Sequence, residues 1–384
     1  MPLPPLSLYV HIPWCVKKCP YCDFNSHVAG DGIPEQAYVA ALQSDLTAAI
    51  ACAQGRPVQS IFFGGGTPSL FSADAIDTLL TSINASLTLA DDIEITLEAN
   101  PGASDQERFT GYRQAGVNRL SLGAQSFNDQ HLRALGRIHS ADDIDRAITA
   151  AQEAGFDAIN IDVMYGLPEQ TVAQGLADLA HAVAMRPGHI SWYELTIEAN
   201  TAFYNRRPTL PPEDNLAALE EAGRHLLSDA GYRRYEVSAY SQSRAQASIH
   251  NQNYWRFGDY IGIGAGAHGK ISYPQPRRIE RQWKTRSPRD YLQPENGLST
   301  NVRAIPASQL PMEFMMNALR LIDGVEEQAF ERHTGLSVDT IKPTLTRLRS
   351  EGLLRNGKRL CATDKGLQFL DSILMAFSNG EPSA

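Results

Sequence analysis

The sequence predicts an α/β protein: a partial TIM-like (β/α)6 barrel followed by a mostly helical, winged-helix-like C-terminal domain. Two observations predict the barrel. Short apolar or β-branched runs alternate with amphipathic helical stretches over the first half of the chain, and a glycine-rich or polar cluster follows nearly every run. A third observation predicts the second domain, because this alternation gives way to consecutive helical patterns from about residue 311.

Six runs are predicted as strands of a parallel sheet because each is short, apolar and separated from the next by a helical pattern. The predicted strands span residues 8–12, 60–63, 93–97, 119–122, 158–163 and 190–195. The helices between them are predicted at 36–51, 73–87, 105–115, 141–154 and 172–185. Six such units in series favour a complete or partial barrel over an open three-layer sandwich.

Three cysteines follow the first predicted strand with the spacing C-x3-C-x2-C: Cys15, Cys19 and Cys22. A [4Fe-4S] cube needs four external ligands, so three thiolates would leave one iron open to another molecule. A Cys3His zinc site completed by His11 or His27 remains an alternative. Disulfides are disfavoured, because the chain has 5 cysteines in 384 residues and no apolar signal segment before residue 8. The cysteine usage is therefore typical of a cytoplasmic protein with reduced thiols.

Further clusters follow the next four predicted strands. They are Gly64-Gly65-Gly66-Thr67-Pro68, Glu98-Ala99-Asn100-Pro101, Gly123-Ala124-Gln125-Ser126 and the segment that begins at Asp162. Each alone is an ordinary turn, but strands of a parallel barrel end at the same face, where barrel sites assemble. The sequence therefore predicts one site at the C-terminal mouth of the barrel.

Composition excludes some classes of function. The hydrophobic share of 43% and the charged share of 20% are typical of globular proteins, and no apolar stretch is long enough to span a bilayer. The net charge of -9 argues against a protein that coats nucleic acid.

In the C-terminal domain, helices are predicted at 312–321, 325–334 and 338–351. Nine basic and nine acidic residues between 313 and 371 disfavour DNA binding there, although several cations cluster along the third helix.

The cysteine motif in its strand context, Tyr9-Val10-His11-Ile12-Pro13-Trp14-Cys15, resembles the radical S-adenosylmethionine superfamily. Within it, the chain is similar to the oxygen-independent coproporphyrinogen III oxidase family from Tyr9 to about residue 370. The resemblance implies a [4Fe-4S] cluster on Cys15, Cys19 and Cys22, with S-adenosyl-L-methionine on the open iron, where one electron can split its sulfonium. It also implies a radical SAM core over 1–240, a connecting segment over 241–310, a winged-helix-like domain over 311–376 and a flexible tail over 377–384.

The resemblance also assigns residues to the S-adenosylmethionine site. Glycines without a Cβ would let the backbone approach the methionine amine, Arg137 would neutralise the carboxylate, and Asp162 would accept ribose hydroxyl groups. Without the family pattern, Arg137 would be read as a surface cation. The complete implied set is Tyr9, Tyr21, Gly65, Gly66, Thr67, Glu98, Gln125, Arg137 and Asp162.

Two departures favour one branch of that family, the heme chaperones. The oxidases carry a further cysteine two residues after the third, where this chain has Phe24. The segment His250-Asn251-Gln252-Asn253-Tyr254-Trp255 resembles the H-N-x-x-Y-W heme motif of the chaperones, with His250 as axial ligand and Tyr254 and Trp255 against the macrocycle. From the residues alone, a packed loop is the more common role for such a histidine, and His268 is a competing ligand.

The sequence thus predicts a cytoplasmic heme chaperone that binds a [4Fe-4S] cluster, S-adenosylmethionine and heme and passes heme to an acceptor, such as a membrane-associated respiratory enzyme. Whether S-adenosylmethionine is cleaved stays open. Two alternatives remain: a working oxygen-independent coproporphyrinogen III oxidase, and a heme- or redox-sensing regulator that binds DNA through the C-terminal domain.

Overall fold

A 12-stranded sheet forms the main body of the protein. The computed structural model describes residues 3–30, 32–102, 105–293 and 300–378. The strand order is β14-β13-β12-β11-β1-β4-β5-β6-β7-β8-β10-β9, and the strands from β11 to β8 run parallel to one another. The strands are β1 Leu6–Ile12, β4 Val58–Gly65, β5 Leu89–Ala99, β6 Arg119–Gln125, β7 Ala158–Tyr165, β8 His189–Glu194, β9 Arg233–Glu236, β10 Ala239–Ser241, β11 Asp259–Ile263, β12 His268–Pro274, β13 Arg277–Trp283 and β14 Asn301–Ala304.

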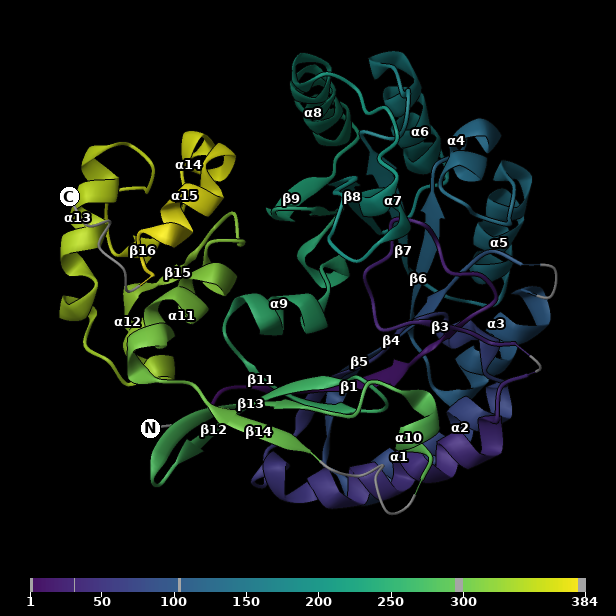
Figure 1. Cartoon of the computed structure of the whole chain (residues 1–384), viewed down its shortest axis with the longest axis horizontal. Helices are drawn as coiled ribbons and strands as arrows, with labels where there is room; N and C mark the ends of the chain where they lie inside the picture. Colours follow the sequence, from purple (N-terminus) through teal and green to yellow (C-terminus); the bar gives the residue numbers. More distant parts are fainter. Residues whose placement is uncertain (1–2, 31, 103–104, 294–299, 379–384) are drawn as a thin grey trace.

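Helices connect the parallel strands and cover the sheet (Figure 1). They are α1 Glu35–Ala49, α2 Ala73–Ser86, α3 Asp105–Ala115, α4 Asp129–Ala134, α5 Ala141–Glu153, α6 Val172–Ala184, α7 Ala202–Asn205, α8 Glu213–Asp229, α9 Ile249–Trp255 and α10 Pro288–Tyr291. Local signals set their starts: Ser140 and Thr171 form capping boxes at α5 and α6. The predicted α/β fold class is confirmed, and the six predicted strands and five helices of the barrel match within a few residues.

The central strand β6 lies between two parallel neighbours, β5 and β7. All seven of its residues are buried. They include the polar Arg119, Ser121 and Gln125, as expected for a strand that is covered on both faces. Leu120 and Leu122 join the large hydrophobic core, while Gln125 ends the strand with φ 71° beside the mouth.

Residues 241–310 do more than connect the two predicted domains. They form α9 and then β11, which adds a parallel strand next to β1, followed by the antiparallel strands β12, β13 and β14. β11 is hard to recognise in the sequence because it contains a glycine that its packing requires. A Cβ at Gly262 would lie 2.0 Å from the His268 carbonyl oxygen. The backbones of β11 and β12 approach too closely for a side chain there, so the run resembles a loop.

The C-terminal unit has the predicted winged-helix outline. Its elements are α11 Leu310–Ala318, β15 Val325–Glu326, α12 Glu327–Thr334, α13 Lys342–Ser350, β16 Arg359–Leu360, α14 Asp364–Gln368 and α15 Leu370–Met375. β15 and β16 pair as a small antiparallel wing. The unit has its own core around Phe314, Phe330 and Leu345. Phe377, the first residue of the predicted tail, is buried in that core, and 379–384 lie outside the described residues.

Side chains of β13 and α9 contact the C-terminal unit. Arg320 of this unit lies 4.3 Å above the ring of Trp255 on α9, and Arg281 of β13 is paired with Glu313 of α11. Phe257 and Ile279, which precede the unit in sequence, are part of its core. Within the described residues, no helix is long and apolar enough to cross a membrane.

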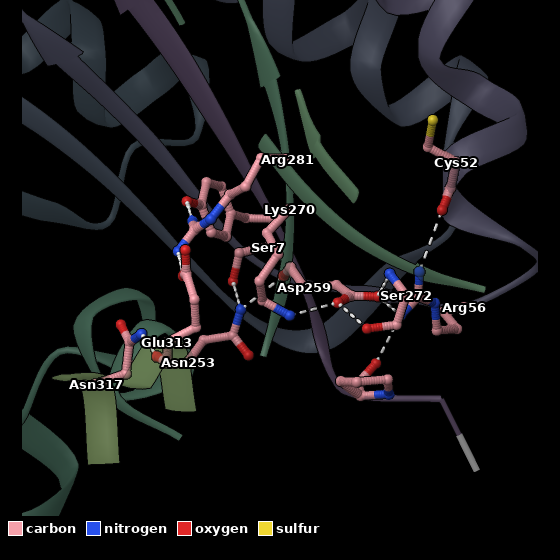
Figure 2. Close-up of polar contacts among 12 residues, drawn as sticks. Ser7, Cys52, Arg56, Asn253, Asp259, Lys270, Ser272, Arg281, Glu313 and Asn317 are labelled. Carbon is pink, nitrogen blue, oxygen red and sulfur yellow. Dashed lines mark hydrogen bonds and ion pairs between the residues drawn. The ribbon is translucent and has the colours of Figure 1, made fainter. Parts of the chain in front are cut away.

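A buried charge network lies at the start of β11 (Figure 2). One oxygen of Asp259 accepts from Lys270 Nζ at 2.9 Å and from Ser272 Oγ at 2.8 Å, and the other accepts from Arg56 Nη1 at 2.7 Å. Burial opposes the charge on Asp259, but Lys270, Ser272 and Arg56 together hold its pKa below the usual value. Burial lowers the pKa of Lys270, and Asp259 offsets part of that effect. Each buried charge therefore depends on its partners.

Candidate functional site

The predicted barrel-mouth site exists as a cavity of about 270 Å³. The cysteine loop and the ends of five parallel strands supply its walls, because parallel strands present their carboxyl ends at one face. The lining residues are Cys15, Lys17, Cys19, Tyr21, Cys22, Phe24, Ser26, Gly65, Gly66, Thr67, Glu98, Ala99, Asn100, Ser121, Gly123, Gln125, Arg137, Asp162 and Tyr193. Segments that are far apart in the sequence thus form one polar chamber.

All three motif cysteines face this chamber as free thiols. Burial raises the pKa values of Cys15 and Cys22, so both thiols need a cationic partner to ionise. Arg137 Nη1 lies 3.6 Å from Cys19 Sγ. A metal cluster supplies positive charge to such a set, and three thiolates on separate iron atoms do not have to converge on one point.

The zinc alternative finds no matching arrangement. Both ring nitrogens of His11 are engaged, Nδ1 with Tyr9 Oη at 3.0 Å and Nε2 with the Asn25 carbonyl oxygen at 2.9 Å. Across the described part of the chain, no group of three or more His, Cys, Asp or Glu side chains is placed to hold one metal ion. The cysteine set therefore fits a cluster better than a single ion.

Glycines bring backbone close to the cavity wall. A Cβ at Gly66 would lie 2.4 Å from the Trp14 carbonyl oxygen, and Gly65 has φ 119°, a conformation that other residues rarely adopt. The Gly65 amide donates to Glu98 Oε2 at 3.2 Å. The loop after β4 thus packs directly against the cysteine loop.

Two buried carboxyl groups give the cavity its acidic character. Burial, together with the charge of Asp162, raises the pKa of Glu98 to about 8. Burial also raises the pKa of Asp162, although Asn160 and Ser121 donate hydrogen bonds to it. Carboxyl groups kept from water in this way favour a ligand that brings positive charge.

Arg137 joins three walls of the cavity. Its Nη2 donates to Asn100 Oδ1 at 2.7 Å and to the Gly123 carbonyl oxygen at 2.6 Å, and Nη1 points at Cys19. Its Nε is buried and has no hydrogen-bond partner among the residues that the structure describes. A buried, unpartnered donor is costly, so this atom indicates a missing acceptor in the cavity.

The cavity contains every residue predicted for S-adenosylmethionine except Tyr9, which lines a second cavity described below. Sequence reasoning missed Asn100, Ser121, Gly123 and Tyr193. Asn100 and Gly123 stand in the predicted strand-end clusters, so the same rule could have selected them. Tyr193 lies near the end of β8, where its hydroxyl donates to Gln125 Oε1 at 2.9 Å.

A second cavity, of about 570 Å³, adjoins the first. Its lining is rich in aromatic side chains and includes Tyr9, His11, Asp23, Phe24, Asn25, Gly65, Glu98, Tyr254, Tyr260, Gly266, His268, Trp283 and Arg286. Three residues, Phe24, Gly65 and Glu98, line both cavities. Phe24, at the position of the oxidase cysteine, is 63% exposed and stands between them.

The three residues of the predicted heme motif have different surroundings. His250 is buried, with Nδ1 hydrogen-bonded to Ser60 Oγ and Nε2 to Tyr254 Oη, both at 3.0 Å. Burial lowers its pKa to about 3. Tyr254 lines the second cavity, whereas Trp255 packs beneath Arg320 of the C-terminal unit. The three residues lie on one short helix, α9, and their side chains project toward different neighbours.

Comparison with known proteins extends the resemblance found in the sequence. Residues 9–180 match the family model described as the radical SAM superfamily, and residues 305–369 match the HemN C-terminal domain. The solved structure of coproporphyrinogen III oxidase (HemN) from Escherichia coli superposes with a TM-score of 0.82 at 23% identity, covering 99% of this chain and 91% of that one. At this identity, the likeness establishes the fold.

Curated relatives match the chain from end to end. The heme chaperone HemW of Escherichia coli (strain K12) is 48% identical over 380 residues, covering 98% of each protein. The heme chaperone HemW of Haemophilus influenzae is 47% identical over 384 residues, with 99% of each covered. Radical S-adenosyl methionine domain-containing protein 1 of Bos taurus is 35% identical over 96% of this chain. The chain therefore belongs to the heme chaperone HemW family within the radical SAM superfamily.

Proposed function

We propose that this protein is a heme chaperone that carries a [4Fe-4S] cluster and S-adenosylmethionine and transfers heme to an acceptor protein. The observation that carries the proposal is the pair of adjoining cavities, one lined by the three cysteines and the other by aromatic side chains and a histidine. The names of the full-length relatives give the same activity.

Several residues of the first cavity suit this cofactor pair. Cys15, Cys19 and Cys22 would hold three irons, and the open iron would take the methionine end of S-adenosylmethionine, supplying one-electron chemistry when both are bound. Arg137 would donate hydrogen bonds to the methionine carboxylate, and Glu98 would face the positive charge of the ligand. Gly65 and Gly66, which line the cavity, would bring backbone groups to its amine.

Replacing Arg137 with lysine tests this assignment of roles. Lysine keeps the charge but loses the planar fork that bonds Asn100 and the Gly123 carbonyl oxygen together. We expect the affinity for S-adenosylmethionine to fall ~10-fold or more, since charge-assisted hydrogen bonds contribute roughly 1.5–3 kcal/mol. Equilibrium dialysis with the labelled ligand measures this, and iron content should not change. Arg133→Lys on the exposed side of α4 is the matched control, and equal affinities in both variants would contradict the assignment.

Phe24 separates this proposal from coproporphyrinogen oxidation. The oxidase motif has a cysteine at this position, and here the exposed Phe24 ring borders both cavities without any ligating atom. An aromatic ring offers contact area to a flat macrocycle instead.

One anaerobic comparison tests the chaperone function. The cluster is reconstituted in the full chain, and coproporphyrinogen decarboxylation is assayed while heme is titrated in parallel. We expect stable heme uptake, transfer to an added heme-free acceptor, and no turnover to protoporphyrinogen. Turnover at enzyme-like rates without stable heme uptake would establish the oxidase alternative.

The C-terminal unit serves a docking role better than a DNA-binding one. Four of its cations are paired with acids of the same unit: Lys342 with Asp339, Arg347 with Glu351, Arg349 with Glu327 and Arg359 with Glu326. Phosphate binding requires cations that can leave such pairs.

We place the protein in the cytoplasm, where the free thiols would stay reduced, and its acceptor, such as a membrane-associated respiratory enzyme, would bind there.

A further inference from the structure

We propose that heme occupies the second cavity with His268 as its axial ligand, and that His250 acts indirectly by positioning Tyr254. This inference rests on the proposed heme-chaperone function and assigns the site that the function needs. It departs from the reading of the His250 motif as the ligand. Three independent features of the described residues support it: ring-nitrogen availability, the aromatic walls and a nearby cation.

The first feature is the hydrogen-bond state of the two histidines. Both nitrogens of His250 are used, by Ser60 and by Tyr254, and the side chain is only 2% exposed. His268 is exposed at the rim of the cavity, and within the described residues neither of its ring nitrogens has a hydrogen-bond partner. A metal ligand needs a free nitrogen lone pair, which His268 can present and which His250 could present only by giving up one of its two hydrogen bonds.

The second feature is the surface beside His268. In the antiparallel pair of β12 and β13, His268 lies directly opposite Trp283, so both side chains project from the same face of the sheet. Both line the cavity. An imidazole beside an indole ring therefore gives a flat ligand a coordinating atom and an aromatic contact within one cross-strand pair.

Two tyrosines also line the cavity. The rings of Tyr254 and Tyr260 meet edge to face, with centroids 4.4 Å apart at 83°. The hydroxyl of Tyr260 accepts from Arg281 at 2.7 Å, and that of Tyr254 is bonded to His250. Because the polar tips of both rings are occupied, their aromatic bodies form the cavity surface. A cavity of about 570 Å³ lies within the ~300–1,000 Å³ of small-molecule sites.

The third feature is charge. Arg286 is exposed and lines the cavity, and its guanidinium group has no hydrogen-bond partner within the described residues. A guanidinium group binds carboxylates in a bidentate manner, so Arg286 suits a heme propionate. The cavity thus contains an imidazole, aromatic faces and a cation, the three groups that would recognise a metalloporphyrin dicarboxylate.

This placement gives the H-N-x-x-Y-W motif a positioning role. His250 bonds the Tyr254 hydroxyl from behind while its own ring stacks on Phe62, with centroids 4.8 Å apart. Loss of His250 would free Tyr254 to change its rotamer and alter the cavity wall, weakening heme binding without changing the iron ligand.

The test compares three single variants of the full-length protein with reconstituted cluster: His268→Ala, His250→Ala and, as a control, His225→Ala at an exposed position on α8. Ferric heme is titrated, and the absorption and electron paramagnetic resonance spectra of the bound heme are recorded. We expect His268→Ala to bind heme ~10-fold or more weakly with a changed Soret band and spin state, since metal affinity falls by such factors even for outer-shell changes. Added imidazole should restore the wild-type spectrum.

The other variants separate the possible outcomes. His250→Ala should weaken binding while keeping the wild-type spectrum, and His225→Ala should change neither. Arg286→Gln should lower heme affinity more than Arg289→Gln, an exposed neighbour outside the cavity lining. A wild-type spectrum in His268→Ala combined with its loss in His250→Ala would overturn the inference and leave the chaperone function standing. No heme uptake by the wild-type protein would overturn both.

Discussion

Cys19→Ala is expected to remove the iron-sulfur cluster. Its thiol is one of three that face the cavity, and a four-iron cube with only two protein ligands lacks half of its external ligands. After anaerobic reconstitution, iron and acid-labile sulfide per chain should fall ~10-fold or more. The measurement is the iron and sulfide content of the desalted protein, together with its visible absorption.

Cys52→Ala provides the matched control for this prediction. Cys52 is also a free, partly buried cysteine, but it lies beside Tyr273 and Gln282, outside the cysteine cavity. Its replacement should leave the iron content unchanged. Full iron in Cys19→Ala, or equal losses in the two variants, would contradict the assignment of the cluster to the motif.

Asp259→Ala is expected to lower the free energy of unfolding more than any other substitution proposed for this protein. Removing this carboxylate leaves Lys270, itself 2% exposed, as a buried cation without its partner, and deprives Arg56 and Ser272 of bonds (Figure 2). Breaking a buried pair from one side typically costs ~3–5 kcal/mol. Urea denaturation followed by circular dichroism should show a clearly lower midpoint.

The exposed pair of Arg233 and Asp323 is the control for this experiment. Its side chains are 59% and 64% exposed, so Asp323→Ala should cost less than about 1 kcal/mol. The pH dependence supplies a second readout. Because the folded pKa of Asp259 is lowered, its contribution is complete above the unfolded value of ~3.9 and is lost as pH falls through the folded pKa. Asp259→Ala should lack this acid-dependent component. Equal losses in both variants would show that burial of the pair is unimportant.

Much of the barrel could be predicted because its information is local. Runs such as 119–122 and 158–163 carry an apolar residue at every second position and are bounded by turns, and the helices begin at capping residues such as Ser140. The site followed from one general fact, that parallel strands end at the same face. That fact places Glu98, Gln125 and Asp162 at one face of the sheet, and the cavity contains all three.

What could not be predicted depends on contacts between distant segments. The Gly262 region resembles a loop until β12 is placed against it, because the reason for its glycine is the His268 backbone. Likewise, nothing near His250 in sequence indicates that Ser60, far away on β4, takes one of its nitrogens. Arg137 reads as a surface cation because its partners, Asn100 and Gly123, belong to other strands. Tertiary context decides such roles.

The wall shared by the two cavities has a thermodynamic consequence. Glu98 and Gly65 face both chambers, so ligands in the two chambers meet the same groups. Equilibrium binding at linked sites is reciprocal: the factor by which S-adenosylmethionine changes heme affinity must equal the factor by which heme changes the affinity for S-adenosylmethionine. With heme in the second cavity as proposed, S-adenosylmethionine would change the affinity for heme through the groups that the two chambers share.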